Sequence, residues 1–366
     1  MASACEREIA HASGVALSRR DGQSPLSDVH NHAILRGVIL PAVFRLTRRV
    51  FPLVLAVALI AAAEAARPGV SVDKTREQKT AQFESLPLVR SKQNHLLVRA
   101  FINGKEAWLG VDSGAPVSAI ATNRRQHFKL TGIPTSSSLP PRLQINGGFN
   151  SVAIVHHFRL GGLDLLDEPV VTVDLGNSAR GTRLMDEQQI DGILGADILF
   201  PTKAVMDCQR QLLILKLDPQ LPGSAPGMSY RGLNAVPIQV SDGFNLYVNA
   251  SINGTAARLM VDTGAFATLL HRSFVRRMKI PVRETPFSSA AVNLRQRGVQ
   301  MATIRRLSVG STVISGREVG VIDLQGLIHD RLLRGKPPVA GLLGAEILSR
   351  NHGIIDFGTR TLYMGN

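Results

Sequence analysis

The chain has 366 residues, of which 44% are hydrophobic and 19% charged, with 33 glycines and 19 prolines. This composition excludes a disordered chain, and the length suggests about two globular domains rich in short strands and turns. The formal net charge is +14. The lysines and arginines are dispersed and lack the interleaved aromatic residues of a nucleic-acid module, so we expect solvated faces and no nucleic-acid partner.

An apolar stretch preceded by arginines lies near the N-terminus. Residues 45–66 read RLTRRVFPLVLAVALIAAAEAA, with the apolar run over 50–63 and small residues after it. This order is typical of a secretory signal, and the run is shorter than the roughly 20 residues of a bilayer span. We therefore expect residues 1–66 to be an N-terminal extension with a signal peptide, and the protein to be exported to the periplasm or secreted.

An uncleaved membrane anchor through residues 50–63 stays open as an alternative. About 44 residues precede the apolar run, whereas a secretory signal usually has a much shorter head. A start codon assigned too far upstream would also explain this long head.

The next part of the chain, residues 80–217, carries strand signals. Apolar and polar residues alternate in LLVRAFING, which ends in Asn103-Gly104, a strong hairpin signal. A second apolar run then leads into Asp112-Ser113-Gly114. Further along lie a glycine-rich hairpin around Gly147 and Gly148, in LQINGGFNSVAIV, and GILG followed by the short helical segment ADILF.

The same series of elements occurs a second time. A segment rich in Pro and Gly predicts a linker over 218–230, and residues 231–366 then repeat the first unit. The hairpin LYVNASING leads to Asp262-Thr263-Gly264, and GLLG is followed by AEILS. Two homologous units of this length indicate a duplication into two lobes and not a stacked repeat.

The repeated aspartates need an explanation beyond local turns. Asp-Ser/Thr-Gly alone is a common turn composition. Two copies at equivalent positions, each with its own Leu-Gly partner, are not required by a turn. A carboxylate after Val111 or Val261 is partly desolvated and needs hydrogen-bond donors, which a neighbouring hydroxyl and glycine N–H groups can supply.

These motifs resemble those of the retropepsin-like aspartyl protease family, in a tandem arrangement similar to a bilobed pepsin, over roughly residues 80–366. The resemblance implies an all-β fold of two homologous β-barrel lobes with short helices, related by a pseudo-twofold axis. It also implies a catalytic pair, Asp112 and Asp262, with support from Ser113, Gly114, Thr263 and Gly264. Ser113 and Thr263 would bond across the lobe interface, and four residues would pack against the catalytic loops: Leu194, Gly195, Leu343 and Gly344.

The reaction implied is hydrolysis of peptide bonds in a peptide or protein substrate. Two adjacent carboxyl groups share one proton, so that one activates a water and the other polarises the carbonyl. This chemistry needs no covalent intermediate, cofactor or metal. Gly147 and Gly148 are candidate flap residues, although an ordinary hairpin is an equal alternative, and the counterpart in AVNLRQRGVQMATI is less clear.

Two departures keep other functions open. Pro116 and Phe266 follow the aspartate loops where small polar residues are more usual. An inactive peptide-binding protein of the same fold is therefore the alternative, and it would require Asp112 and Asp262 to lie beyond hydrogen-bond reach. Lobes that pair between chains are a further alternative, but the linker favours a monomer with intramolecular pairing.

The remaining polar residues have structural interpretations. Cys5 lies in the extension, so no internal disulfide is expected. His156-His157 is interpreted as a pair on a strand surface and not as a metal site. Cys208 is expected in the core, and Asp207 and Asp356 in strand-end turns. Asn253 is expected in a hairpin turn, although it also begins a formal glycosylation sequon. Asp197 and Glu346 are expected as acids in the first turns of short helices.

Overall fold

The computed structural model describes residues 83–92, 94–134, 136–139, 141–145, 148–175, 189–217, 230–241, 244–285, 288–291, 294–297, 299–329, 333 and 335–365. All of them lie in one compact unit, Asp73–Asn366. The predicted extension and signal at 1–66 and nearly all of the linker at 218–230 lie outside the described residues. Within the ranges above, no helix is long and apolar enough to span a membrane.

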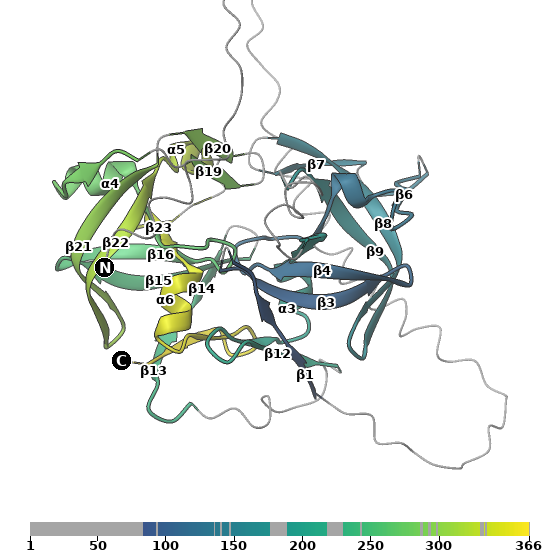
Figure 1. Cartoon of the computed structure of the whole chain (residues 1–366), viewed down its shortest axis with the longest axis horizontal. Coiled ribbons are helices and arrows are strands. Elements are labelled where there is room, and N and C mark those ends of the chain that lie inside the picture. Colours follow the sequence, from purple (N-terminus) through teal and green to yellow (C-terminus); the bar gives the residue numbers. More distant parts are fainter. Residues whose placement is uncertain are drawn as a thin grey trace, which may run out of the picture. The chain divides into compact units, whose positions relative to one another are not determined.

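Lobe 1 is a closed barrel of six strands. Its ring runs β3-β4-β10-β5-β9-β8, and β8 pairs back with β3. Asn103 and Gly104 join β3 to β4 with φ of 49° and 78°, the left-handed backbone that an Asn-Gly hairpin turn requires. The ring strands, coloured blue to teal in Figure 1, are β3 (Leu96–Ile102), β4 (Lys105–Val111), β5 (Ala119–Ala121), β8 (Gly148–Leu160), β9 (Leu163–Val173) and β10 (Gly192–Leu194), with β2 (Val89–Arg90), β6 (Thr131–Gly132) and β7 (Arg142–Ile145) beside them.

Lobe 2 repeats this barrel. Its ring runs β15-β16-β23-β17-β22-β21, and β21 pairs back with β15. Asn253 and Gly254 form the equivalent hairpin turn, as predicted, with φ of 50° and 85°. The ring strands are β15 (Asn245–Ile252), β16 (Thr255–Val261), β17 (Leu269–His271), β21 (Gln300–Val309), β22 (Thr312–Ile322) and β23 (Val339–Leu343), with β14 (Gln239–Ser241), β18 (Val282–Arg283) and the hairpin of β19 (Ser288–Ala291) and β20 (Leu294–Arg297).

A third sheet contains strands of both lobes. Its order is β1-β12-β11-β24-β25-β13, and the lobes meet where β11 pairs with β24. Asp207 and Asp356 end these two strands and accept hydrogen bonds from backbone N–H groups of the following turns, as predicted. The strands are β1 (Phe83–Pro87), β11 (Val205–Asp207), β12 (Leu212–Lys216), β13 (Asn234–Pro237), β24 (Ile354–Asp356) and β25 (Thr361–Met364).

Cys208 lies just beyond β11 and is buried, as predicted for a core residue. Burial raises the pKa of its thiol to about 12. The thiol is therefore protonated at physiological pH, which excludes a role as a reactive nucleophile.

The helices are short and more numerous than the sequence suggested. Two were expected, α3 (Ala196–Leu199) and α6 (Ala345–Arg350), and both are present. Three were not expected: η1 (Thr122–Arg124), α4 (Arg272–Arg277) and α5 (Gln325–His329). In α4 only Phe274 and Val275 are buried, and its N-cap His271 makes no side-chain cap bond. Because one apolar pair gives almost no periodicity, such a helix leaves little trace in the sequence.

Candidate active site

Each aspartate follows a barrel strand and is held by the strand that carries the Leu-Gly motif. Asp112 N donates to the Leu194 carbonyl at 3.0 Å, and Asp262 N donates to the Leu343 carbonyl at 3.1 Å. These bonds continue the parallel pairing of β10 with β4 and of β23 with β16. The Leu-Gly segments therefore fix where the two loops begin.

The loops are joined across the lobe interface by two hydroxyl residues. Ser113 Oγ donates to the Val261 carbonyl at 2.9 Å, and Thr263 Oγ1 donates to the Val111 carbonyl at 2.8 Å. Each hydroxyl also accepts a bond from the other residue's backbone N–H, at 3.1 and 2.9 Å. Both residues are buried. This symmetric network holds the aspartates in register across the interface.

The two carboxyl groups are partly buried, and each lies against the glycine of the opposite loop. Asp112 Oδ1 accepts from Gly114 N at 2.8 Å. Asp262 Oδ1 accepts from Gly264 N and Ala265 N, both at 3.0 Å.

Burial raises the pKa of both aspartates. For Asp262 the charge of Asp112 adds to the effect of burial. For Asp112 burial is the largest cause, and the Gly114 N–H and the charge of His95 oppose it. Because two carboxylates in contact cannot both ionise easily, the pair retains one proton over a wide pH range.

The glycines of the two loops lie against the carboxyl group of the opposite lobe. A Cβ added at Gly114 would lie 2.7 Å from Asp262 Cγ, and a Cβ at Gly264 would be closer still to Asp112. Neither position leaves room for a side chain. Glycine is therefore required here by close approach between the lobes.

Comparison with known proteins gives a family match. A family model described as "Aspartyl protease" matches residues 98–198 and 248–347, more than half of the chain. The chain belongs to the aspartyl protease family. Among solved structures, it is similar to the aspartic proteinase from Irpex lacteus, with 13% identity, 78% of this chain and 97% of that chain covered, and a TM-score of 0.46. Comparison with curated proteins gives no match. The family assignment rests on the family model.

A second set of contacts was missed in the sequence analysis. Ser118 N and Oγ both donate to the Asp197 carboxylate at 2.7 Å, and Gly195 N donates to Ser118 Oγ at 3.0 Å. In lobe 2, Thr268 N donates to Glu346 at 2.8 Å and Gly344 N donates to Thr268 Oγ1 at 3.0 Å.

The two acids therefore anchor the end of each aspartate loop, a role beyond that of the first-turn helix acids we expected. The repeat itself contained the signal. Ser118 and Thr268 occupy the same position in the two copies, six residues after each aspartate.

The two departures from the family pattern leave the carboxylate bonds in place. Phe266 has 56% of its surface exposed. Its backbone carbonyl accepts a bond from Asn94 Nδ2 of lobe 1 at 3.0 Å. Pro116 is partly exposed in the corresponding loop. Both residues follow the N–H groups that bond to the aspartates, so their side chains do not replace a donor.

Each lobe has a hairpin at the position considered for a flap. In lobe 1, β7 pairs with β8 from Ile145 opposite Gly148. Gly147 lies outside the described residues. In lobe 2, β19 pairs with β20, so a hairpin is present in the segment where the counterpart was unclear from sequence.

The histidine pair of β8 lies on the surface, as predicted. His156 and His157 are both exposed. His156 Nδ1 lies 2.7 Å from Asp167 Oδ1, and its Nε2 lies 2.7 Å from Thr131 Oγ1. Among the described residues, no group of three or more His, Cys, Asp or Glu side chains could hold a metal ion.

Proposed function

We propose that this protein is an aspartic endopeptidase whose water is activated by Asp112 and Asp262. The observation that carries the proposal is the close approach of the two aspartate loops, with each carboxyl group against the opposite glycine and a matching glycine N–H donor in each lobe. Family membership supports the same reaction class. No second function is favoured by a specific feature of the described residues.

The pair supports a division of labour between the two carboxyl groups. Burial raises the pKa of both groups, so that the pair holds one proton that belongs to the two carboxyl groups together. The ionised member removes a proton from water as its oxygen attacks the carbonyl carbon, and the protonated member protonates the carbonyl oxygen to give a neutral gem-diol. Proton transfer to the amide nitrogen then allows the C–N bond to break, releasing an amine and a carboxylic acid.

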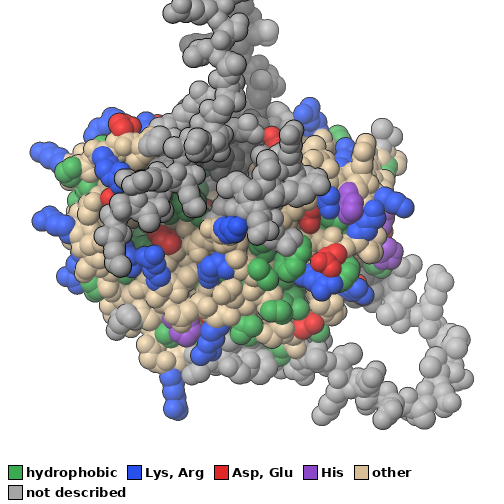
Figure 2. Space-filling model, in the orientation of Figure 1, with side chains coloured by type: hydrophobic (Ala, Val, Ile, Leu, Met, Phe, Trp, Pro, Cys, Tyr) green, Lys and Arg blue, Asp and Glu red, His purple; other side chains and the backbone are tan. Residues whose placement is uncertain are grey.

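The substrate we propose is an extended peptide segment bound between the loops. The hairpins β7–β8 and β19–β20 are candidates for covering it, and the notable glycines of the first are Gly148 of β8 and, from the sequence, Gly147. Nucleic acid is not proposed as a partner. On the face visible in Figure 2, the Lys and Arg side chains are scattered among other side chains and do not form one continuous patch.

The experiment is cleavage of a mixed peptide library across pH by wild type, Asp112→Asn and Asp262→Asn. Wild type should show a bell-shaped profile, because activity requires one ionised and one protonated carboxyl group. Since the pKa of Asp262 is raised, activity on the alkaline side of this profile should fall at a pH above the ordinary Asp pKa of about 4. Each variant should lose at least about 10³-fold in kcat/KM. Full activity in either folded variant would refute the shared pair.

Export and monomeric pairing remain proposals that rest on the sequence. The basic-apolar-small order of residues 45–66 supports a signal, with membrane attachment through residues 50–63 as the alternative. Mass spectrometry of the N-terminus after expression with an export machinery would separate them. A mature chain starting near residue 66 supports a cleaved signal, and an intact N-terminus in the membrane fraction supports an anchor.

A further inference from the structure

The strand that leads into each catalytic aspartate is paired with the strand before it. In lobe 1, β3 and β4 are antiparallel, with Leu97 opposite Gly110. A Cβ added at Gly110 would lie 4.0 Å from Leu97 Cδ2, so these two positions share one face of the sheet. Because side chains alternate between the faces, two further residues along each strand bring His95 opposite Asp112 on that same face.

The equivalent position in lobe 2 carries an amide. There β15 pairs with β16, with Tyr247 opposite Met260, and the same two steps bring Asn245 opposite Asp262. Asn245 is buried, and its Nδ2 donates to Tyr247 Oη at 3.4 Å. An amide does not ionise, whereas an imidazole ordinarily gains a proton below about pH 6.5. The two lobes therefore differ in whether a positive charge can form opposite the aspartate.

The backbone of His95 is held in a short turn between β2 and β3. Ser91 N donates to the His95 carbonyl at 2.9 Å, and His95 N donates to Ser91 Oγ at 3.1 Å. The turn also contacts lobe 2, because Asn94 Nδ2 donates to the carbonyl of Phe266, four residues after Asp262, at 3.0 Å. The turn is therefore attached to its own barrel and to the aspartate loop of the opposite lobe.

The basic side chains beside this turn keep their charge through the acid range. Arg90 Nη1 donates to Asn94 Oδ1 at 2.7 Å, and its Nη2 donates to the Cys208 carbonyl. Lys92 is exposed. Arginine and lysine ordinarily stay protonated up to about pH 10. His95 is therefore the residue of this turn whose charge changes between about pH 4 and pH 8.

The charges of His95 and Asp112 act on each other. Burial raises the pKa of Asp112, and the charge of His95 opposes this rise more than any other charge does. Asp262 faces the same group from the opposite lobe, and its pKa is raised by burial and by the charge of Asp112. A positive charge on His95 therefore favours loss of the first proton from the carboxyl pair.

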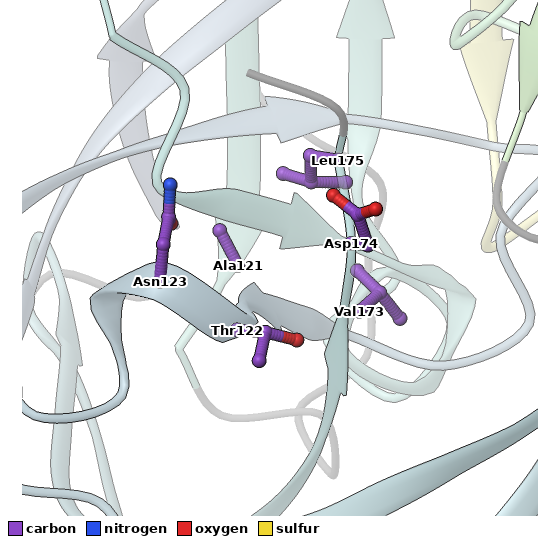
Figure 3. Close-up of a pocket in the computed structure, with 6 residues that line it drawn as sticks. All are labelled: Ala121, Thr122, Asn123, Val173, Asp174 and Leu175. Carbon is purple, nitrogen blue, oxygen red and sulfur yellow. The ribbon is translucent and has the colours of Figure 1, made fainter. Parts of the chain in front are cut away.

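The pocket shown in Figure 3 is built from other residues of lobe 1. It has a volume of about 420 Å³ and lies at the ends of β5 and β9. The residues that line it are Ala121, Thr122, Asn123, Val173, Asp174 and Leu175. None of them belongs to an aspartate loop or to the turn of His95.

We propose that His95 is a positioning residue that acts through Asp112: its positive charge keeps one carboxyl group of the pair ionised at acid pH and so extends peptide cleavage to lower pH. The reaction needs one ionised carboxyl group. The effect on cleavage rests on the proposed function, whereas the effect on the carboxyl pair can be measured without turnover. Asn245 cannot supply this charge, so it comes from one lobe only.

The experiment is a carbon-13 NMR titration of the aspartate carboxyl groups in the full chain, beside the pH profile of kcat/KM. The catalytic signals are assigned by their loss in Asp112→Asn and Asp262→Asn. His95→Asn places the lobe 2 residue in lobe 1 and should raise the lower midpoint of the pair, and the acid limb of the profile, by about 0.5–1 pH unit. His95→Lys keeps a positive charge and should leave both within about 0.3 pH unit of wild type. His157→Asn removes an exposed imidazole from β8 and should change neither.

The two readouts separate this proposal from the proposed function. An unchanged lower midpoint in folded His95→Asn, or in the second neutral variant His95→Gln, would overturn the proposal whatever the activity. Equal rises in His95→Asn and His95→Lys would also overturn it, because packing and not charge would then be the cause. A midpoint that rises in the neutral variants of a protein that cleaves no peptide would support the charge effect and refute the peptidase function. Circular dichroism at each pH verifies that the variants are folded.

Discussion

Lobe 1 and lobe 2 position their aspartates with matching backbone bonds, but one pair of equivalent strand positions carries opposite charges. Glu168 of β9 pairs with Val155, and Arg317 of β22 pairs with Ile304, so the two residues occupy equivalent positions. In lobe 1 the neighbour of Asp197 is therefore a second acid. In lobe 2 the residue that matches this neighbour is a base.

The comparison distinguishes the backbone bonds, which are the same in both lobes, from side-chain positions at which the two lobes differ. The Gly114 and Gly264 N–H groups make the same bond to the carboxyl group of each lobe, whereas the equivalent residues Glu168 and Arg317 differ in charge. Burial, followed by the charge of Asp197, raises the pKa of Glu168 to about 7. We therefore expect lobe 1 to be the half whose stability responds to pH between the acid range and neutrality.

The largest effects should come from the glycines that the lobes present to each other. Gly264→Ala adds a Cβ against Asp112, and Gly114→Ala adds one 2.7 Å from Asp262 Cγ. Both should reduce kcat/KM by at least about 10²-fold by displacing the reacting groups, and Gly264→Ala by more. Steady-state kinetics with a peptide substrate measures this.

Gly326→Ala provides the matched control for these variants. A Cβ at that position meets no atom within 4 Å. It should leave kcat/KM within about twofold of wild type. Equal activity of Gly264→Ala and Gly326→Ala would show that the two loops do not approach each other as closely as described.

The cross-lobe hydroxyls should give the next largest effect. Thr263→Ala removes the bond to the Val111 carbonyl and the acceptor for Ser113 N, both buried. We expect a loss of about 2–4 kcal/mol in the free energy of unfolding, measured by denaturant titration. Thr263→Ser keeps both bonds and matches the residue of lobe 1, so it should cost less than about 1 kcal/mol. Similar losses in both variants would mean that methyl packing, and not the hydrogen bonds, holds the loops.

Replacement of Glu168, the acid beside Asp197, should give the smallest effect. It should raise the stability of the protein, whereas the variants above lower activity or stability. With a folded pKa of about 7 and an ordinary value of 4.5, Glu168 keeps its proton in the folded state while the unfolded chain loses it. Its contribution to stability is therefore present below pH 4.5 and is lost as pH rises to about 7.

Glu168→Gln removes this loss. It should stabilise the protein by about 1–3 kcal/mol at pH 7.5 and have little effect at pH 4, which thermal unfolding at the two pH values would measure. Arg317→Gln is the matched variant in lobe 2 and should show no gain at pH 7.5. A gain at pH 4 equal to that at pH 7.5 would contradict the titration of Glu168.

Much of this arrangement could be predicted because the sequence contains two copies of the same unit. Asp112 alone would have been interpreted as a turn residue, and its pairing with Asp262 came from the alignment of the two copies. The all-β fold, the two lobes and the Asn-Gly hairpins are confirmed for the same reason. Local turn chemistry and the repeat agree at these positions.

The features that were missed depend on contacts between residues far apart in the chain. Ser118 and Asp197 are 79 residues apart, and nothing local to either residue specifies their bond. The short helix α4 lacks a cap and a periodic apolar face.

The central claim, that the two unequal lobes of one chain form a single active site, is tested most directly by mixing. Asp112→Asn and Asp262→Asn are combined in equal amounts, unfolded and refolded together, and assayed for peptide cleavage beside refolded wild type. If the lobes pair within one chain, the mixture stays as inactive as either variant alone. Recovery of about a quarter of wild-type activity, as expected for random pairing of lobes between chains, would contradict the account.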